Sequence, residues 1–222
     1  MAVTPLMPSG RRRSLYELFT MYKNHYSGRF IAFEGLDGAG STTQAKKLSV
    51  YLRKRHKKVH LTKEPTNNLI GGLIRGQLTK EWRTGPECLQ LLFTADRAHH
   101  IEKEVIPLLK QGITVITDRY FFSSVAFGSL GIEDREWLRE INDRFILPDI
   151  TFILKVSPKV CLQRINESRF HLELFEEEAD MEKIWRTYAD LAQEYGDVYI
   201  VSGEKSEEEV FREVSKIVDE LL

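Results

Sequence analysis

The stretch Phe-Ile-Ala-Phe-Glu-Gly-Leu-Asp-Gly-Ala-Gly-Ser-Thr-Thr-Gln, residues 30–44, decides the fold. An apolar run at 30–33 leads into glycines at 35, 38 and 40, and an amphipathic helical pattern follows. Glycines let backbone N–H groups turn inward, and the helix directs its positive N-terminus at the same point. We therefore predict a loop that binds a polyphosphate. Its predicted phosphate contacts are Gly35, Gly38, Ala39, Gly40, Ser41, Thr42 and Thr43.

Two side chains at the end of this loop carry its chemistry. Thr42 stands where such loops place the hydroxyl that binds Mg²⁺. Ser41 stands where they place a lysine, which normally holds the outer phosphates. The loop therefore predicts a nucleotide site and leaves open how the γ-phosphate is held.

Composition limits the class of protein. At 222 residues the chain has the length of one α/β domain, and its 42% hydrophobic and 29% charged content is that of a globular protein. The net charge of −1 predicts neither a nucleic-acid nor a membrane partner, so an anionic substrate needs a local cluster of Arg and Lys. No apolar run has the length of a membrane span, and we expect a cytoplasmic protein whose two cysteines, Cys88 and Cys161, are buried thiols.

Apolar runs alternate with helical patterns along the chain. Runs at 30–34, 59–62, 113–117, 150–156 and 198–201 predict strands that are covered on both sides. The fold class is therefore α/β, a doubly wound five-stranded parallel sheet with helices on both faces. Ser157-Pro158 and the capping box of Ser206 with Glu209 predict two helix starts.

Two further segments carry specific expectations. Residues 87–110 predict a long amphipathic helix. Its expected buried residues are Leu91, Leu92, Ala95, Ile101, Val105 and Leu108. Residues 1–26 predict a tail followed by an extra helix at about 14–26, with the main domain at 27–222.

Ligands of such sheets bind beyond the carboxyl ends of the strands. That rule brings the phosphate loop, Lys63-Glu64-Pro65 and Asp118-Arg119-Tyr120 to one crevice. Asp118 can organise Mg²⁺, and the adjacent Arg119 can bind phosphate oxygens. Phe93 and Arg97 are spaced i, i+4, so a ring and a guanidinium share one helix face, as a nucleobase site requires. A core phenylalanine beside a surface arginine would give the same spacing.

The chain resembles the thymidylate kinases, which are nucleoside-monophosphate kinases with a P-loop fold. The resemblance runs from about residue 30 to the C-terminus. It rests on Phe-Glu-Gly-Leu-Asp-Gly-Ala-Gly at 33–40, Glu-Pro at 64–65, Ile-Arg at 74–75, Leu-Leu-Phe-Thr-Ala-Asp-Arg at 91–97 and Asp-Arg-Tyr-Phe-Phe-Ser-Ser-Val-Ala-Phe at 118–127. These motifs in this order are far more specific than any one of them.

The resemblance implies a role for each matching residue. Asp37 would bind the 3′-hydroxyl of dTMP, Phe93 would stack on thymine and Arg97 would bind its O4 edge. Arg75 and Arg119 would bind the acceptor phosphate. Thr42 and Asp118 would organise Mg²⁺. The same motifs place Glu64, Pro65, Ser124 and Phe127 in the dTMP site.

The family also has a mobile lid whose arginines close over the donor phosphates. The charged segment 164–178 matches it, with Arg164 and Arg169 as its candidate catalytic arginines. A solvated helix and loop would have the same composition.

The resemblance implies transfer of the γ-phosphoryl group of ATP to dTMP by a magnesium-dependent homodimer. Ser41 departs from the family, which has lysine there. A cation from elsewhere, such as Lys63 or a lid arginine, could replace it. Alternatively, backbone amides and Mg²⁺ alone could support slow turnover, or the chain could bind nucleotide without efficient turnover. A kinase for another acceptor, such as dUMP or a deoxynucleoside, and a regulatory nucleotide-binding paralogue are the competing functions.

Overall fold

The structure is a computed structural model that describes residues 22–168 and 177–221. Five parallel strands form one sheet in the order β2-β3-β1-β4-β5. The strands are β1 (Phe30–Gly35), β2 (Val59–Lys63), β3 (Thr114–Asp118), β4 (Ile150–Lys155) and β5 (Val198–Ser202). This confirms the predicted fold class and all five predicted strands, with ends that move by one residue.

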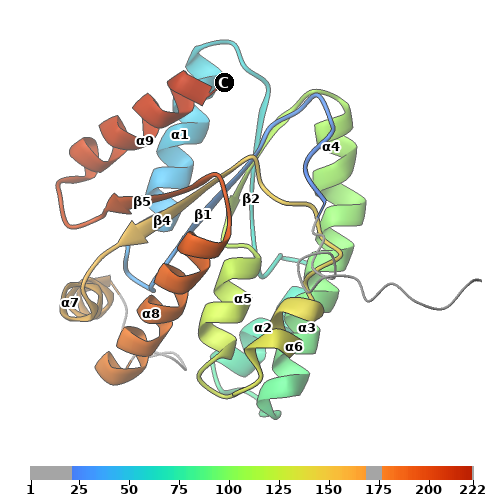
Figure 1. Ribbon diagram of the computed structural model, residues 1–222, viewed down its shortest axis with the longest axis vertical. Coiled ribbons are helices and arrows are strands. Elements are labelled where there is room, and N and C mark those ends of the chain that lie inside the picture. The colour runs from blue at the N-terminus through green and yellow to red at the C-terminus, as the bar shows by residue number, and fades with distance from the viewer. Residues whose placement is uncertain (1–21, 169–176, 222) are drawn as a thin grey trace, which may run out of the picture.

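Helices cover both faces of the sheet, as Figure 1 shows: α1 and α9 lie on one face, and α5 and α8 lie on the other. The helices that follow the first two strands are α1 (Ser41–Lys54), α2 (Leu69–Leu78), α3 (Pro86–His100), a π-helical segment η2 (Ile101–Val105) and α4 (Ile106–Lys110). The later helices are α5 (Phe121–Gly128), α6 (Arg135–Glu140), α7 (Pro158–Ser168), α8 (Glu178–Glu194) and α9 (Glu207–Leu221). No helix within the described ranges is long and apolar enough to cross a membrane.

The central strand β1 is buried along its whole length, because helices cover it on both sides and β3 and β4 flank it. The order of strands reverses beside β1, so the crossover connections diverge there and leave a crevice at the carboxyl edge. Gly35, Lys63 and Asp118 end the three adjacent strands at that edge. Both predicted helix starts are confirmed: α7 begins at Pro158, and Ser206 N–H donates to Glu209 Oε2 at 3.0 Å ahead of α9.

The predicted helix at 87–110 is present as α3, η2 and α4, and Ile101 and Val105 are buried as predicted, but Leu91 and Ala95 are not. Leu91 is 51% exposed and Ala95 is also exposed, whereas Asp96, Arg97 and His100 are buried. The reason is that α3 packs against α2 and α5 beside the crevice, so its inner face carries the polar groups of a site. Cys88, on the same helix, is exposed and not buried as expected, whereas Cys161 is buried.

The N-terminal expectation falls mostly outside the described residues. Residues 22–26, the end of the expected extra helix, are not helical. There the Asn24 amide donates to Gly28 O at 2.8 Å and to Asp149 Oδ2 at 2.7 Å, and Leu147 N–H donates to Tyr22 O at 3.0 Å. These hydrogen bonds hold residues 22–26 against the domain without helical structure. Residues 169–176 of the expected lid, with Arg169, also lie outside the described residues.

Candidate active site

The phosphate loop connects β1 to α1 and depends on three glycines with left-handed or otherwise positive φ. Gly35, Gly38 and Gly40 have φ of 148°, 79° and 99°, a conformation that other residues rarely adopt. At Gly38 an added Cβ would lie 2.6 Å from the carbonyl oxygen of Cys161, so glycine also permits the close approach of α7. The helix α1 then begins at Ser41 with its N-terminus at the loop, which makes the loop an anion site.

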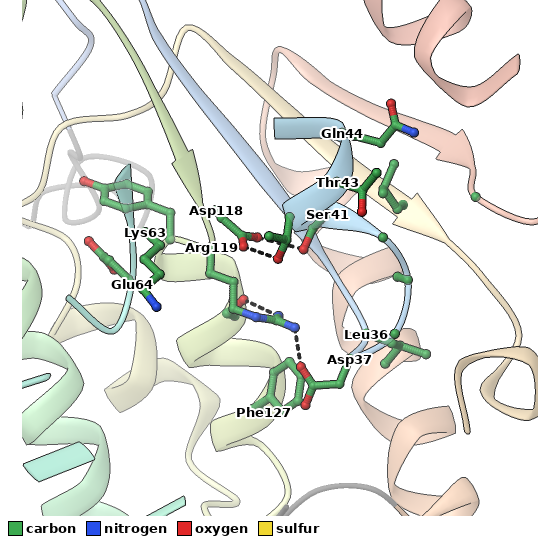
Figure 2. Close-up of a pocket in the computed structure, with 18 of the residues that line it drawn as sticks. Leu36, Asp37, Ser41, Thr43, Gln44, Lys63, Glu64, Asp118, Arg119 and Phe127 are labelled. Carbon is green, nitrogen blue, oxygen red and sulfur yellow. Dashed lines mark hydrogen bonds and ion pairs between the residues drawn. The ribbon is translucent and has the colours of Figure 1, made fainter. Parts of the chain in front are cut away.

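Asp118 joins the end of β3 to the start of α1. Ser41 Oγ donates to Asp118 Oδ1 at 2.7 Å, and the Thr42 hydroxyl donates to Asp118 Oδ2. Figure 2 shows both bonds as dashed lines between the two elements. The structure therefore brings the two predicted magnesium residues together. It also shows that the hydroxyl in the lysine position is bound to a carboxylate.

Arg119 is held in the centre of the crevice. Its own φ is 73°, and its Nη1 donates to Gly35 O at 2.8 Å and to Ser123 Oγ at 3.0 Å. Its Nη2 lies 2.5 Å from Asp37 Oδ1 (Figure 2). Burial alone would lower the pKa of Arg119, but the negative charge of Asp37 raises it above its ordinary value. The guanidinium thus stays charged.

Glu34, which the sequence analysis missed, is linked to Arg119 through the Ser123 hydroxyl. This fully buried carboxylate accepts hydrogen bonds from Tyr120 N–H at 2.9 Å, from the Ser123 hydroxyl and from Tyr188 OH at 3.2 Å. Burial raises the pKa of Glu34 from 4.5 to about 7. An acidic residue inside an otherwise apolar strand was the available signal, because a buried charge requires partners.

The predicted base-binding residues lie at the other end of the crevice. Arg97 is only 1% exposed, and its Nε donates to Glu64 Oε2 at 2.9 Å. Its Nη2 donates to Ser124 Oγ at 2.9 Å, and its Nη1 donates to Asn142 Oδ1. Arg97 is therefore a fixed donor and not a surface arginine, as the i, i+4 spacing alone would have allowed.

A histidine that the sequence analysis also missed holds the second oxygen of Glu64. His100 Nδ1 lies 3.0 Å from Glu64 Oε1, and its Nε2 lies 3.7 Å from Glu104 Oε1. Burial would lower the pKa of His100, but its interactions with Glu104 and Glu64 raise it to about 9. The interaction with His100 in turn lowers the pKa of Glu104 to about 2. The buried Glu64 therefore lies between two cations, Arg97 and protonated His100.

One cleft of about 700 Å³ is lined by the phosphate loop, by Asp118 and Arg119 and by Glu64 and Arg97. Its lining contains the predicted acceptor residues Asp37, Glu64, Pro65, Arg75, Phe93, Arg97, Arg119, Ser124 and Phe127. It also contains the predicted phosphate and metal residues Gly38, Ala39, Gly40, Ser41, Thr42, Thr43, Asp118 and Arg164. Gly35 lies beneath the lining and contacts Arg119 through its carbonyl group. The lining combines the glycine loop and charged side chains with the rings of Phe93 and Phe127, a combination that suits nucleotides.

Like Arg119, two further arginines of the cleft donate to backbone carbonyl groups. Arg75 Nη1 donates to Thr66 O, and Arg164 Nη2 donates to Gly203 O at 3.0 Å. Arg164 Nη1 also lies 3.4 Å from Gly38 O, so α7 brings this residue against the phosphate loop.

The oxygen groups of Thr42 and Asp118 are the ligands that Mg²⁺ prefers. Within the described ranges, no cluster of three or more His, Cys, Asp or Glu side chains could hold a metal by itself. That pattern fits Mg²⁺, which is usually bound by one or two protein groups together with substrate phosphates.

Comparison with known proteins gives a consistent result. Residues 33–214 match the family model described as thymidylate kinase. A probable thymidylate kinase of Thermococcus gammatolerans is 36% identical over 87% of this chain and 97% of its own length. A thymidylate kinase of Thermosipho africanus is 34% identical over 87% of this chain and 98% of its own length.

Among solved structures, a thymidylate kinase from Candida albicans has a TM-score of 0.72 and 24% sequence identity. The match covers 86% of this chain and 91% of that one, and it shows that the fold is shared. The family model and the two relatives extend over the phosphate loop, the Arg97 site and the Asp118-Arg119 pair together. The chain belongs to the thymidylate kinase family.

Proposed function

We propose that this protein transfers the γ-phosphoryl group of ATP to dTMP and so produces ADP and dTDP. The observation that carries the proposal is the single cleft, which joins the phosphate loop to a second site with a ring, Phe93, and a fixed donor, Arg97. A protein that only bound ATP would not need the second site. The family membership supports the same reaction.

The reaction requires positioning more than proton transfer. A phosphate oxygen of dTMP forms a bond to the γ-phosphorus, while the bond from that phosphorus to the β–γ bridging oxygen breaks and its electron pair stays on ADP. The attacking phosphate is already ionised at neutral pH, so no strong base is needed. Catalysis then depends on alignment and on neutralising negative charge.

The residues of the cleft divide these tasks. The backbone N–H groups of the loop and the N-terminus of α1 bind the donor phosphates. Arg119 and Arg75 bind the acceptor phosphate, and Arg119 exchanges part of its bond to Asp37 for that phosphate. Asp37 then becomes free to accept from the 3′-hydroxyl. Arg164, already beside the loop, lies close enough to Gly38 to contact the donor.

Thr42 and Asp118 would hold Mg²⁺. The ion would neutralise charge on the donor phosphates. Ser41, which donates to Asp118 Oδ1, fixes the orientation of that carboxylate.

At the base end, Phe93 stacks on thymine and Arg97 donates to its O4 edge. The position of Arg97 is set by Glu64, Ser124 and Asn142, so a base that presents an acceptor at this edge is favoured over one that presents an amino group. We expect cytosine to be rejected because its N4 amino group would leave the guanidinium donor unpaired.

The experiment is a coupled assay of ADP release with Mg-ATP and dTMP, dUMP, dCMP, UMP or thymidine, each beside a control without acceptor. Turnover that prefers dTMP supports the proposal. Preference for another acceptor assigns a related kinase. ATP binding without turnover on any acceptor assigns a regulatory nucleotide-binding protein.

We also propose that two copies of the chain associate through α2 and α3. These helices pack against each other, and both expose leucines: Leu69 is 83%, Leu73 45% and Leu91 51% exposed. Because most of the buried residues of α3 are polar, Leu91 is left outside, where a second copy would cover it. Sedimentation equilibrium should give twice the chain mass, and Leu91→Glu should shift the equilibrium toward the single chain. A wild-type protein of single-chain mass would contradict this.

A further inference from the structure

The phosphate loop has Ser41 where such loops place a lysine, and the serine does not supply the positive charge of that lysine. Ser41 is buried, and its hydroxyl donates to Asp118 Oδ1 at 2.7 Å. A preorganised charge at this place normally stabilises the phosphoryl group while it is transferred. If the cleft carries out that transfer, another positive group must reach the same space.

The cations that line the cleft can be separated by their partners. Five of them already donate to an acceptor: Arg75 to Thr66 O, Arg97 to Glu64, Arg119 to Asp37, Arg164 to Gly203 O and Lys205 to Glu213. Lys63 is the remaining one, and within residues 22–168 and 177–221 its ammonium group has no hydrogen bond or ion pair. Lys63 can therefore turn toward a phosphate without first breaking an ion pair.

The position of Lys63 matches the missing charge. It ends β2 and is the register partner of Asp118 on β3, whose carboxylate contacts Ser41. Neighbouring strands lie about 4.8 Å apart, which a lysine side chain spans easily. Lys63 lines both the main cleft and an adjoining cavity of about 580 Å³ that it shares with Thr42 and Asp118. In Figure 2 the Lys63 side chain is drawn between the side chains of Glu64 and Arg119, which line the same cleft.

We propose that Lys63 supplies from β2 the positive charge that other phosphate loops carry at position 41, and that it contacts the oxygens of the transferred phosphoryl group. The proposal rests on the proposed kinase function. A lysine suits this task because its ammonium is a compact charge on a flexible stem and can follow the phosphoryl group between donor and acceptor. Lys63 is thus a catalytic residue.

The test is a set of five variants, four single and one double, in the ADP-release assay at saturating ATP and acceptor. Lys63→Ala should lower kcat by roughly 10²–10³-fold, the usual effect of losing one such charge. Its acceptor KM should stay within about 3-fold of wild type, since the contact acts mainly in the transition state. Lys63→Arg should retain a larger kcat than Lys63→Ala. Lys46→Ala is the control, because Lys46 is exposed and lines only the adjoining cavity.

The decisive variant restores the charge from the loop itself. Ser41→Lys combined with Lys63→Ala should recover at least tenfold in kcat over Lys63→Ala, while Ser41→Lys alone should gain little. A Lys63→Ala enzyme with wild-type kcat would overturn the proposal. The proposal would also be overturned if the double variant had the same low kcat as Lys63→Ala while Ser41→Lys alone remained active. A wild-type protein that releases no ADP with any acceptor would instead refute the proposed function, so the two failures are distinct.

Discussion

Replacing Arg97 with alanine tests the buried ion pair at the base end of the cleft. The guanidinium is 1% exposed and donates to Glu64 at 2.9 Å, to Ser124 at 2.9 Å and to Asn142. Removing one partner of a buried pair costs about 3–5 kcal/mol, because the other charge stays buried without its counterion. Here His100 remains 3.0 Å from Glu64 and compensates part of that cost. We therefore expect Arg97→Ala to lower the free energy of unfolding by about 3 kcal/mol.

Urea denaturation at pH 7 without nucleotide, followed by tryptophan fluorescence, measures this cost without the effect of ligand binding. The control is Arg135→Ala, which removes an exposed pair with Asp190 at 3.2 Å and should cost at most about 1 kcal/mol. Glu64→Gln in the Arg97→Ala background should recover stability, because it removes the stranded charge. A cost below about 1 kcal/mol for Arg97→Ala, or a further loss on adding Glu64→Gln, would refute the reasoning.

The same variant separates the two nucleotide sites in function. Under conditions where Arg97→Ala is folded, we expect its affinity for dTMP to fall far more than its affinity for ATP, since Arg97 lies at the base end and not at the phosphate loop. Calorimetric titration with each ligand measures both. Equal losses for the two ligands would contradict the assignment of Arg97 to the acceptor base.

Three further predictions follow from single contacts. The pKa of Glu34 is raised from 4.5 to about 7, so the folded state binds more protons than the unfolded state between these pH values. The free energy of unfolding should therefore fall as pH rises through that window, by up to about 3 kcal/mol. Glu34→Gln should abolish this dependence, and parallel pH profiles of wild type and variant in urea denaturation would contradict it. Gly38→Ala places a Cβ 2.6 Å from the Cys161 carbonyl oxygen at a φ of 79°. It should lower the free energy of unfolding by about 1–3 kcal/mol in thermal denaturation and weaken ATP binding in titrations. Unchanged ATP affinity would count against the loop geometry. Ser206→Ala removes the capping box with Glu209 and should lower the free energy of unfolding by about 1 kcal/mol without changing kcat. A drop in kcat larger than the drop in the fraction of folded protein would show that this helix start does more than cap α9.

The sequence by itself determined the local elements of this protein and the phosphate loop. Apolar runs, glycine spacing and the capping box around Ser206 act over a few neighbouring residues, so their structural consequences do not depend on distant parts of the chain. The rule that parallel strands end at one edge then placed Asp118 and Arg119 beside the loop. The same rule placed Glu64 there, and the i, i+4 spacing indicated Phe93 and Arg97 as a possible base site; the resemblance to a family added Asp37 and a specific role for each of these residues.

Tertiary structure alone decided which charges are buried and what they contact. The partners of Arg97 and Glu34 include Asn142 and Tyr188, which lie 45 and 154 residues away along the chain. No local pattern in the sequence indicates such contacts. A helix whose inner face lines a polar site carries polar residues inside and apolar residues outside, the reverse of a helix that packs on an apolar core. That is why Leu91 was expected to be buried and is exposed, and why the roles of Glu34 and His100 became visible only once the chain was folded.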